Sequence, residues 1–277
     1  MKKTLIALLA FGGCASAATE LVANWDDFSN LKDSTETYSL VLSEGNASVT
    51  NGVLTIAGSQ QSDSNQSPAY ATIDISSVGL TMKSGFTLST TVSNVNMLSG
   101  TSNPVSIFGL ASADNSFLFS AAFHTNNADK SQFKFAYDGS TTNVDAGSYS
   151  STINTEKAEV DTPVTLTLTV DDNQLAWYID GDLSYSSTTK DSKTASGNTV
   201  DITGYREQTL TTLAIGAWVG ATKHGHMTGK VYDLSIYNGA MTALEVKNLV
   251  TGSVPEPTTA TLSLLALAGL AARRRRK

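Results

Sequence analysis

The sequence predicts an all-β sandwich for the body of this chain, and three observations lead to that prediction. Stretches in which apolar and polar residues alternate recur along the chain, as in strands with one buried face. Asn-Gly and Asp-Gly pairs, which favour tight hairpin turns, separate several of these stretches. Runs with helical periodicity are almost absent, so the pattern favours many short antiparallel strands over a parallel sheet covered by helices.

The first residues have the order of a secretory signal peptide. Two lysines at positions 2–3 precede an apolar run at 4–11, and the small-residue sequence Ala15-Ser16-Ala17 follows. The apolar run is too short for a membrane span, which needs roughly 20 residues. We therefore expect signal peptidase to remove residues 1–17 during export.

Cys14 is the only cysteine of the chain. Cleavage after Ala17 leaves a mature protein without cysteine, which excludes disulfides, a thiol nucleophile and cysteine-ligated metal centres. Lipidation of Cys14 is the alternative to that cleavage. Phe11 stands where lipoprotein signals usually carry a branched aliphatic residue, which counts against lipidation.

Residues 18–253 make up the predicted domain, a length that suits one large sandwich. They contain 24 aspartates and glutamates against 11 lysines and arginines, so their net charge is near −13. A surface of this charge repels nucleic acid and anionic lipid and tolerates cations such as calcium. We therefore expect no nucleic-acid partner.

The first predicted strands form a hairpin. Asn51-Gly52 separates residues 47–50 from residues 53–57, and a two-residue loop of this composition favours a type I′ turn. The stretch 58–68 is rich in Ser and Gln and is expected to be a loop. At 86–92 apolar and hydroxyl side chains alternate again, which predicts the next strand.

A three-stranded meander is expected in the second half of the domain. Residues 164–170 alternate four aliphatics with three threonines, which predicts a half-buried strand. Asp180-Gly181 then closes residues 175–179 onto residues 183–186. The Ser- and Thr-rich stretch 186–204 that follows is expected to be a loop.

One helix is expected after the last strand. Alternation places Tyr232, Leu234 and Ile236 on one face of that strand. Thr242 and Glu245 then have the spacing of a capping box, in which each side chain binds the other residue's backbone N–H. We expect this short helix to pack against the edge of the sandwich.

The C-terminal segment 254–277 has three parts. Val254, Pro255, Glu256 and Pro257 are followed by an apolar run within 258–272 and by five cations. Together these parts resemble the PEP-CTERM sorting signal of Gram-negative bacteria. The resemblance implies transient anchoring in the inner membrane, cleavage near Pro255-Glu256-Pro257 by an exosortase, and delivery to the cell surface or extracellular matrix. A permanent C-terminal anchor, with its cations on the cytoplasmic side, is the alternative.

Several segments of the body resemble laminin G-like, concanavalin A-like domains. They are the strand 162–170, the following Leu175–Gly181 with its Tyr-x-Asp-Gly turn, the closing strands at 213–217 and 228–238, the tail 240–246 and the opening strand 21–28. The resemblance implies a jelly-roll sandwich of two antiparallel sheets. It also implies a calcium ion at a sheet rim, with Asp26, Asp27 and Asp233 at positions similar to acidic ones in the family. Surface acids that bind nothing are the alternative.

Candidate ligand-binding residues gather in sequence around 205–226. Tyr205 and Trp218 could present aromatic rings to a sugar, because Trp218 is out of phase with its apolar neighbours. His224 and His226 could supply half of a zinc or copper site, or could simply belong to a polar loop. Trp25 and Trp177 fall on predicted strands and are expected in the core.

The sequence carries no recognised catalytic pattern. Retaining glycosidases need two carboxyl groups about 5 Å apart, and the paired-carboxylate strand pattern of such enzymes on this fold is missing. The acidic stretch 156–161 precedes a proline and is interpreted as a solvated loop. We therefore expect a non-catalytic surface protein that binds glycan or matrix, or serves as a structural envelope component. A polysaccharide hydrolase with an unrecognised carboxylate arrangement and a mere spacer are the alternatives.

Overall fold

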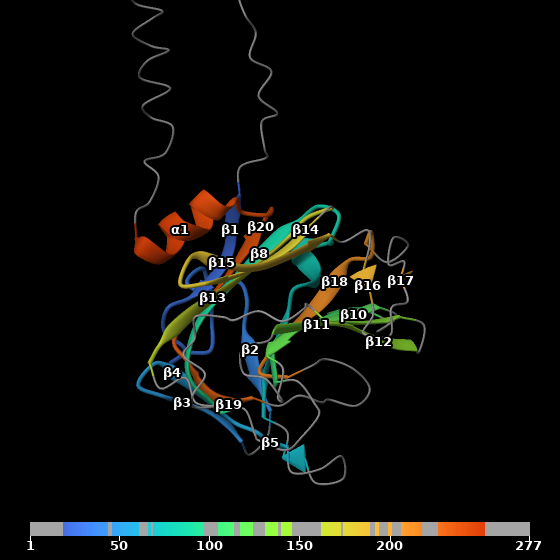
Figure 1. Ribbon diagram of the computed structural model, residues 1–277. Helices are drawn as coiled ribbons and strands as arrows, with labels where there is room; N and C mark the ends of the chain where they lie inside the picture. Colours follow the sequence, from blue (N-terminus) through green and yellow to red (C-terminus); the bar gives the residue numbers. More distant parts are fainter. Residues whose placement is uncertain are drawn as a thin grey trace, which may run out of the picture.

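The computed structural model describes residues 19–43, 46–60, 66–67, 69–96, 105–113, 117–123, 131–137, 140–145, 162–172, 174–188, 192–193, 199–200, 206–217 and 227–252. Two antiparallel sheets pack face to face, and the helix α1 (Ala243–Thr251) lies on the outer side of one of them (Figure 1). The predicted all-β sandwich of two antiparallel sheets is confirmed.

The larger sheet has nine strands. They are β1 (Glu20–Trp25), β3 (Ala47–Thr50), β4 (Val53–Ala57), β8 (Phe86–Asn96), β13 (Val164–Val170), β14 (Gln174–Ile179), β15 (Asp182–Thr188), β19 (Thr228–Val231) and β20 (Leu234–Asn238). Strand β8 is the long central strand. One of its edges pairs with β13, whereas the other pairs first with β20 and then with β19. Tyr232 and Asp233 therefore lie where β8 changes partner.

The smaller sheet has seven strands in the order β12-β11-β10-β9-β18-β7-β2. Their bounds are β2 (Leu40–Leu42), β7 (Ala71–Asp74), β9 (Val105–Ser112), β10 (Phe117–Phe123), β11 (Ser131–Tyr137), β12 (Ser140–Asp145) and β18 (Leu210–Ile215). Two short ladders, β5 (Ser59–Gln60) with β6 (Gln66–Ser67) and β16 (Ser192–Lys193) with β17 (Thr199–Val200), lie in stretches predicted to be loops. A 3-10 helix, η1 (Ser76–Val78), follows β7.

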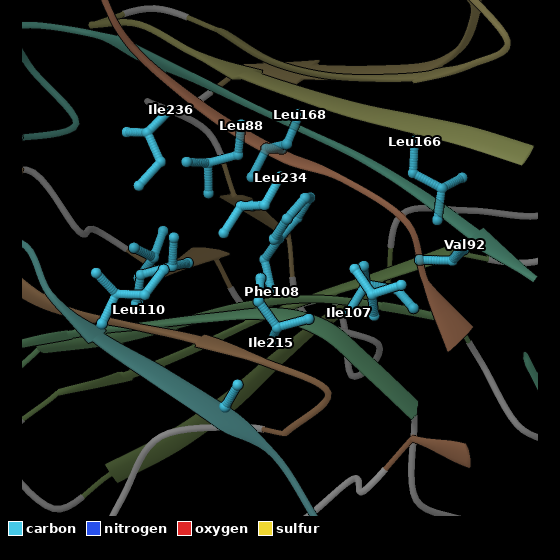
Figure 2. Close-up of a cluster of buried hydrophobic side chains, with 14 of the residues drawn as sticks. Leu88, Val92, Ile107, Phe108, Leu110, Leu166, Leu168, Ile215, Leu234 and Ile236 are labelled. Carbon is cyan, nitrogen blue, oxygen red and sulfur yellow. The ribbon is translucent and has the colours of Figure 1, made fainter. Parts of the chain in front are cut away.

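The core fills the space between the sheets. Figure 2 shows Leu88, Leu168 and Ile236 of the larger sheet above Phe108 and Ile215 of the smaller one. Phe108 meets Trp177 edge to face, with ring centroids 6.2 Å apart. Trp25 and Trp177 are buried, as predicted. Each fully buried leucine, isoleucine or phenylalanine side chain of this core stabilises the fold by about 1.5–3 kcal/mol.

The predicted hairpin turns are confirmed. Asn51 and Gly52 both have positive φ, 52° and 76°, as a type I′ turn requires. The strands that they join have the predicted bounds. Asp180 and Gly181 repeat this conformation between β14 and β15, with φ of 50° and 80°. The meander of β13, β14 and β15 is antiparallel throughout.

Helix α1 begins at the predicted capping box. Thr242 Oγ1 accepts a hydrogen bond from the Glu245 N–H, and Glu245 Oε2 accepts one from the Thr242 N–H at 2.7 Å. The helix lies on the outer face of the larger sheet, where Val246 packs against Ala176 and Tyr178. Strand β15, which α1 also contacts, is the edge strand of this sheet, so the helix lies at the edge of the sandwich as expected.

This position of α1 also changes the environment of β13. Alternation predicted that its threonines would face solvent, yet Thr167 and Thr169 are buried. Tyr178 and α1 cover this part of the outer face, and Tyr178 hydrogen-bonds to Thr169. The aliphatic side chains of β13 face the core as predicted. Strand β13 is thus buried on both faces.

Candidate functional site

Hydroxyl groups line the outer face of the larger sheet in cross-strand pairs. Ser89 and Thr167 hydrogen-bond at 3.0 Å, and Thr91 and Thr165 at 3.1 Å, in each case between β8 and β13. Such pairs stabilise adjacent strands and satisfy polar groups that would otherwise be buried without a partner. Next to this hydroxyl ladder, β20 and β1 continue the same face.

A polar strip lies on the outer side of β1, β20 and the β19–β20 junction. We call it the β1–β20 strip, and its members are Asn24, Asp26, Tyr232, Asp233, Ser235 and Tyr237. In the register of the two strands, Asn24 lies opposite Ser235, while the core residues Trp25 and Leu234 form the next pair. Successive side chains of a strand point to opposite faces. Asn24 and Ser235 therefore point outward, and Ser235 Oγ donates to Asn24 Oδ1 at 2.8 Å.

Asp233 occupies the point where β8 changes partner. Its Oδ1 accepts a hydrogen bond from the Thr91 N–H at 2.8 Å, and its backbone carbonyl accepts one from Thr90 Oγ1 at 2.6 Å. The carboxylate thus satisfies a backbone donor at the junction of two ladders. Burial raises the pKa of Asp233, the hydrogen bond from Thr91 opposes that rise, and the charge of Asp26 adds to it.

The two tyrosines of the strip are half-buried. The Tyr232 hydroxyl hydrogen-bonds to Ser93 Oγ at 2.9 Å. Burial raises the pKa of the Tyr237 hydroxyl, while a hydrogen bond to Ser235 opposes the rise. The prediction that Tyr232 shares a face with Leu234 and Ile236 is wrong. Strand β19 ends at Val231 and β20 begins at Leu234, so Tyr232 and Asp233 lie between the two strands. The alternation of β20 therefore does not extend back to Tyr232.

Asp27 is held by local contacts beside the strip. Its Oδ1 accepts a hydrogen bond from the Ser29 N–H at 2.8 Å, and hydrogen bonds from Ser29 lower its pKa. The carboxylate lies against the β3–β4 turn, where a Cβ added to Gly52 would come within 2.7 Å of Oδ1. The turn is tied to this segment by the Phe28 N–H, which donates to the Gly52 carbonyl at 3.0 Å.

The three aspartates predicted to hold calcium have different surroundings in the structure. Asp233 is turned toward Thr91, and Asp27 toward Ser29 and Gly52, while Asp26 is exposed. Among the residues that the structure describes, no three of His, Cys, Asp and Glu gather into a group that could hold a metal ion. Calcium binding at these positions stays a prediction. A rise in melting temperature when calcium replaces a chelator would support it, and an unchanged temperature would contradict it.

The other predicted site residues lie outside the described residues. These are Tyr205, Trp218, His224 and His226, and the sorting residues Val254, Pro255, Glu256 and Pro257. Their roles stay predictions. Directly after position 205, the buried Arg206 forms an ion pair with Asp172, and Lys83 pairs with Glu207 close by.

Sequence reasoning missed Asn24, Ser235 and Tyr237 as members of one surface. Each sits at a polar position of an alternating strand, which is the signal that could have found them. Their pairing across β1 and β20 could not be read from either segment alone.

Within the described ranges, no helix is long and apolar enough to cross a membrane.

Comparison with protein families identifies the C-terminal segment. Residues 253–277 match the PEP-CTERM protein-sorting motif, which marks the chain for export and sorting to the cell envelope. The predicted sorting signal is thereby confirmed. A search of curated proteins finds no match.

The folded domain is similar to several solved β-sandwich domains. The receptor binding domain of botulinum neurotoxin C/D mosaic serotype has a TM-score of 0.56 at 12% identity, over 85% of this chain and 52% of that chain. A structure of botulinum neurotoxin type C, whose cell entry depends on two ganglioside molecules, has a TM-score of 0.55 at 14% identity, over 84% and 51%. This chain thus spans about half the length of the toxin domains.

A third similar structure matches along nearly its full length. Domain 4 of AbnA, an extracellular GH43 arabinanase from Geobacillus stearothermophilus, was solved in complex with arabinotriose. It has a TM-score of 0.53 at 17% identity, over 84% of this chain and 98% of that domain. At such low identity the likeness shows the fold alone, which is a jelly-roll-like β-sandwich.

Proposed function

We propose that this protein is a surface-sorted, non-catalytic β-sandwich that binds glycan or extracellular matrix, or acts as a structural envelope component. The sorting motif supports a place at the cell envelope. The arabinotriose complex of AbnA domain 4 supports a sugar as ligand, as does the ganglioside dependence of the type C toxin. Within the fold, the laminin G-like subclass is part of the same proposal.

The β1–β20 strip is the surface that we assign to glycan binding, and its composition is the observation that carries the proposal. It combines an amide, a hydroxyl and two carboxyl groups with two half-buried tyrosines. Sugar hydroxyls need donors and acceptors of this kind, and tyrosine offers an apolar ring with a polar end. The contact between Asn24 and Ser235 holds two of these groups in place.

A glycan array probed with residues 18–253 tests the proposal. This fragment contains both sheets, the core and α1. We expect binding to a defined set of glycans that Tyr237→Ala weakens and Val41→Ala leaves unchanged. Val41 is the matched control because it is an exposed residue of β2 in the other sheet. Absence of binding to every glycan would contradict the proposal and favour a spacer or a protein partner.

A polysaccharide hydrolase is the second candidate function, and one observation favours it. Asp233 has a raised pKa beside Asp26, and glycosidases use a protonated carboxyl next to an ionised one. The hydrogen bond from the Thr91 N–H to Asp233 offers another explanation for the buried carboxyl, because it completes the hydrogen bonding of the sheet without any catalytic role. Release of reducing sugar from a polysaccharide panel, abolished by Asp233→Asn, would favour the hydrolase over the binding protein.

Processing at both ends belongs to the proposal as well. We expect signal peptidase to leave Ala18 as the first residue, and an exosortase to cut near Pro257. Mass spectrometry of the protein recovered from its host measures both ends. An intact Arg-rich tail would contradict exosortase cleavage and favour a permanent anchor, and a lipid on Cys14 would contradict cleavage after Ala17.

A further inference from the structure

Helix α1 leads directly into the sorting motif. Gly252 ends the helix in the left-handed conformation, with φ of 67°, and the motif match begins at residue 253. An extended chain spans at most about 3.6 Å per residue, so Pro255 lies within roughly 11 Å of Gly252. By the same estimate, residue 260 in the apolar run lies within about 30 Å. The end of α1 is therefore held close to any membrane that the run enters.

The chain enters the domain on the same side. Thr19 lies beside Gly239, just before α1, since a Cβ added to Gly239 would be 3.6 Å from Thr19 Cα. The helix has nine residues, which corresponds to a length of about 13.5 Å. Figure 1 shows the start of β1 and both ends of α1 at one end of the molecule.

Exposed aliphatic side chains are concentrated on this side. The exposed large hydrophobics of the described residues are Leu21, Val41, Leu183 and Leu244, with exposed fractions of 50%, 64%, 55% and 70%. Leu244 is on α1. Leu21 pairs with Tyr237, and Leu183 pairs with Tyr178 beneath α1. Directly paired residues of antiparallel strands share a face, so both leucines lie on the outer face that carries the helix.

We propose that this α1 face, formed by α1, Leu21 at the start of β1 and the outer side of β15, rests on the lipid surface while the sorting tail is membrane-inserted. The short connection at Gly252 brings the face to the bilayer, and Leu21, Leu183 and Leu244 enter the interfacial region. The nearby cation Lys247 is paired with Asp182, so the face does not depend on attraction to anionic lipid. The proposal rests on the surface sorting proposed above but not on glycan binding.

Binding of the α1 face to the lipid surface depends on the sorting tail, because the face alone binds lipid only weakly. Three leucines bury little area, and the acidic body is repelled by anionic lipid. A short tether turns this weak contact into an intramolecular one with a high effective concentration. Removal of the tail by cleavage then releases the face from the membrane.

Single-cysteine labelling of the full chain tests this orientation. In a Cys14→Ser background each variant carries one thiol, at Leu244→Cys, Leu183→Cys or Val41→Cys. The chain is reconstituted in vesicles of phosphatidylethanolamine and phosphatidylglycerol and treated with a membrane-impermeant maleimide. We expect several-fold slower labelling at positions 244 and 183 than in the soluble 18–253 fragment, and an unchanged rate at position 41.

Three outcomes would overturn the proposal. Position 244 could react as fast in vesicles as in the fragment, or all three positions could be slowed alike, which would indicate general crowding. The full chain could also fail to float with the vesicles. Each outcome leaves the glycan-array result untouched, so the two proposals fail separately. The substituted side chains are exposed, and matching thermal unfolding of the variants checks that all of them fold.

Discussion

The carboxylate of Asp233 accepts a hydrogen bond from the backbone N–H of Thr91, 142 residues earlier in the chain, at 2.8 Å. The contact lies where β8 exchanges one ladder partner for another. A group that the sequence suggested as a calcium ligand therefore also completes the hydrogen bonding of the larger sheet. Because Asp233 is buried beside Asp26, its negative charge destabilises the folded state. The stability of the protein should therefore depend on whether this carboxyl is ionised.

Replacing Asp233 by asparagine should stabilise the protein at neutral pH. The amide oxygen can still accept from Thr91, while the buried charge disappears. Because the folded-state pKa of Asp233 is raised above 3.8, the cost of its ionisation is complete above the raised pKa and vanishes as the pH falls to 3.8. Urea unfolding should show the largest advantage of Asp233→Asn at neutral pH.

Asp233→Ala serves as the control for the hydrogen bond. It leaves the Thr91 N–H without its acceptor, and we expect a loss of about 1–3 kcal/mol in the free energy of unfolding. An asparagine variant that is destabilised as much as the alanine variant at neutral pH would contradict the assigned burial cost.

Replacing Asp33 by asparagine should have the opposite pH dependence. The buried Asp33 carboxylate accepts hydrogen bonds from the Thr35 N–H, the Thr35 hydroxyl and the Tyr38 N–H. Burial acts to raise the pKa of Asp33, but these hydrogen bonds outweigh it and lower the pKa below 3.8. The stabilisation is therefore present above pH 3.8 and is lost as the pH falls through the lowered value.

We expect Asp33→Asn to lose about 1–3 kcal/mol in the free energy of unfolding at neutral pH. Denaturant titrations at neutral pH and below pH 3.8 measure the difference from the unmodified protein. That difference should shrink in acid. A difference independent of pH would show that the ionised form is not the stabilising one.

Gly52→Ala should destabilise the β3–β4 hairpin more than Gly79→Ala destabilises its own turn. Both glycines have positive φ, and an L-residue there costs about 1–2 kcal/mol. Only at Gly52 does the added Cβ also meet a carboxylate, that of Asp27, whereas nothing lies within 4 Å at Gly79. Thermal unfolding compares the two variants. In an Asp27→Ala background the extra loss at Gly52 should disappear, and its persistence would contradict the proposed clash.

Val246→Ala should weaken the attachment of α1 to the sheet. Val246 is fully buried against Ala176 and Tyr178, so we expect a loss of about 1–3 kcal/mol in the free energy of unfolding. Leu244→Ala on the exposed side of the same helix should change it by less than about 0.5 kcal/mol. Equal effects in chemical denaturation would mean that α1 does not pack on the larger sheet through Val246.

Features of the fold that depend on neighbouring residues were predicted correctly from the sequence. The Asn51-Gly52 turn, the strands on either side of it and the capping box of Thr242 and Glu245 all form as predicted, because their determinants lie within a few residues. The two aromatic core positions Trp25 and Trp177 follow from the same alternation. The prediction failed at Tyr232, where a break between two strands reset the alternation.

The sequence by itself therefore determined the all-β class, the turns, the helix start and the sorting motif. Only the tertiary structure decided which polar faces stay exposed. It buried Thr167 and Thr169 beneath Tyr178 and α1, and it joined Asn24 to Ser235 across 211 residues. The reason is physical: periodicity states which side chains share a face, whereas strand pairing and the helix set what covers that face. The β1–β20 strip exists only because β1 and β20, from opposite ends of the domain, lie side by side.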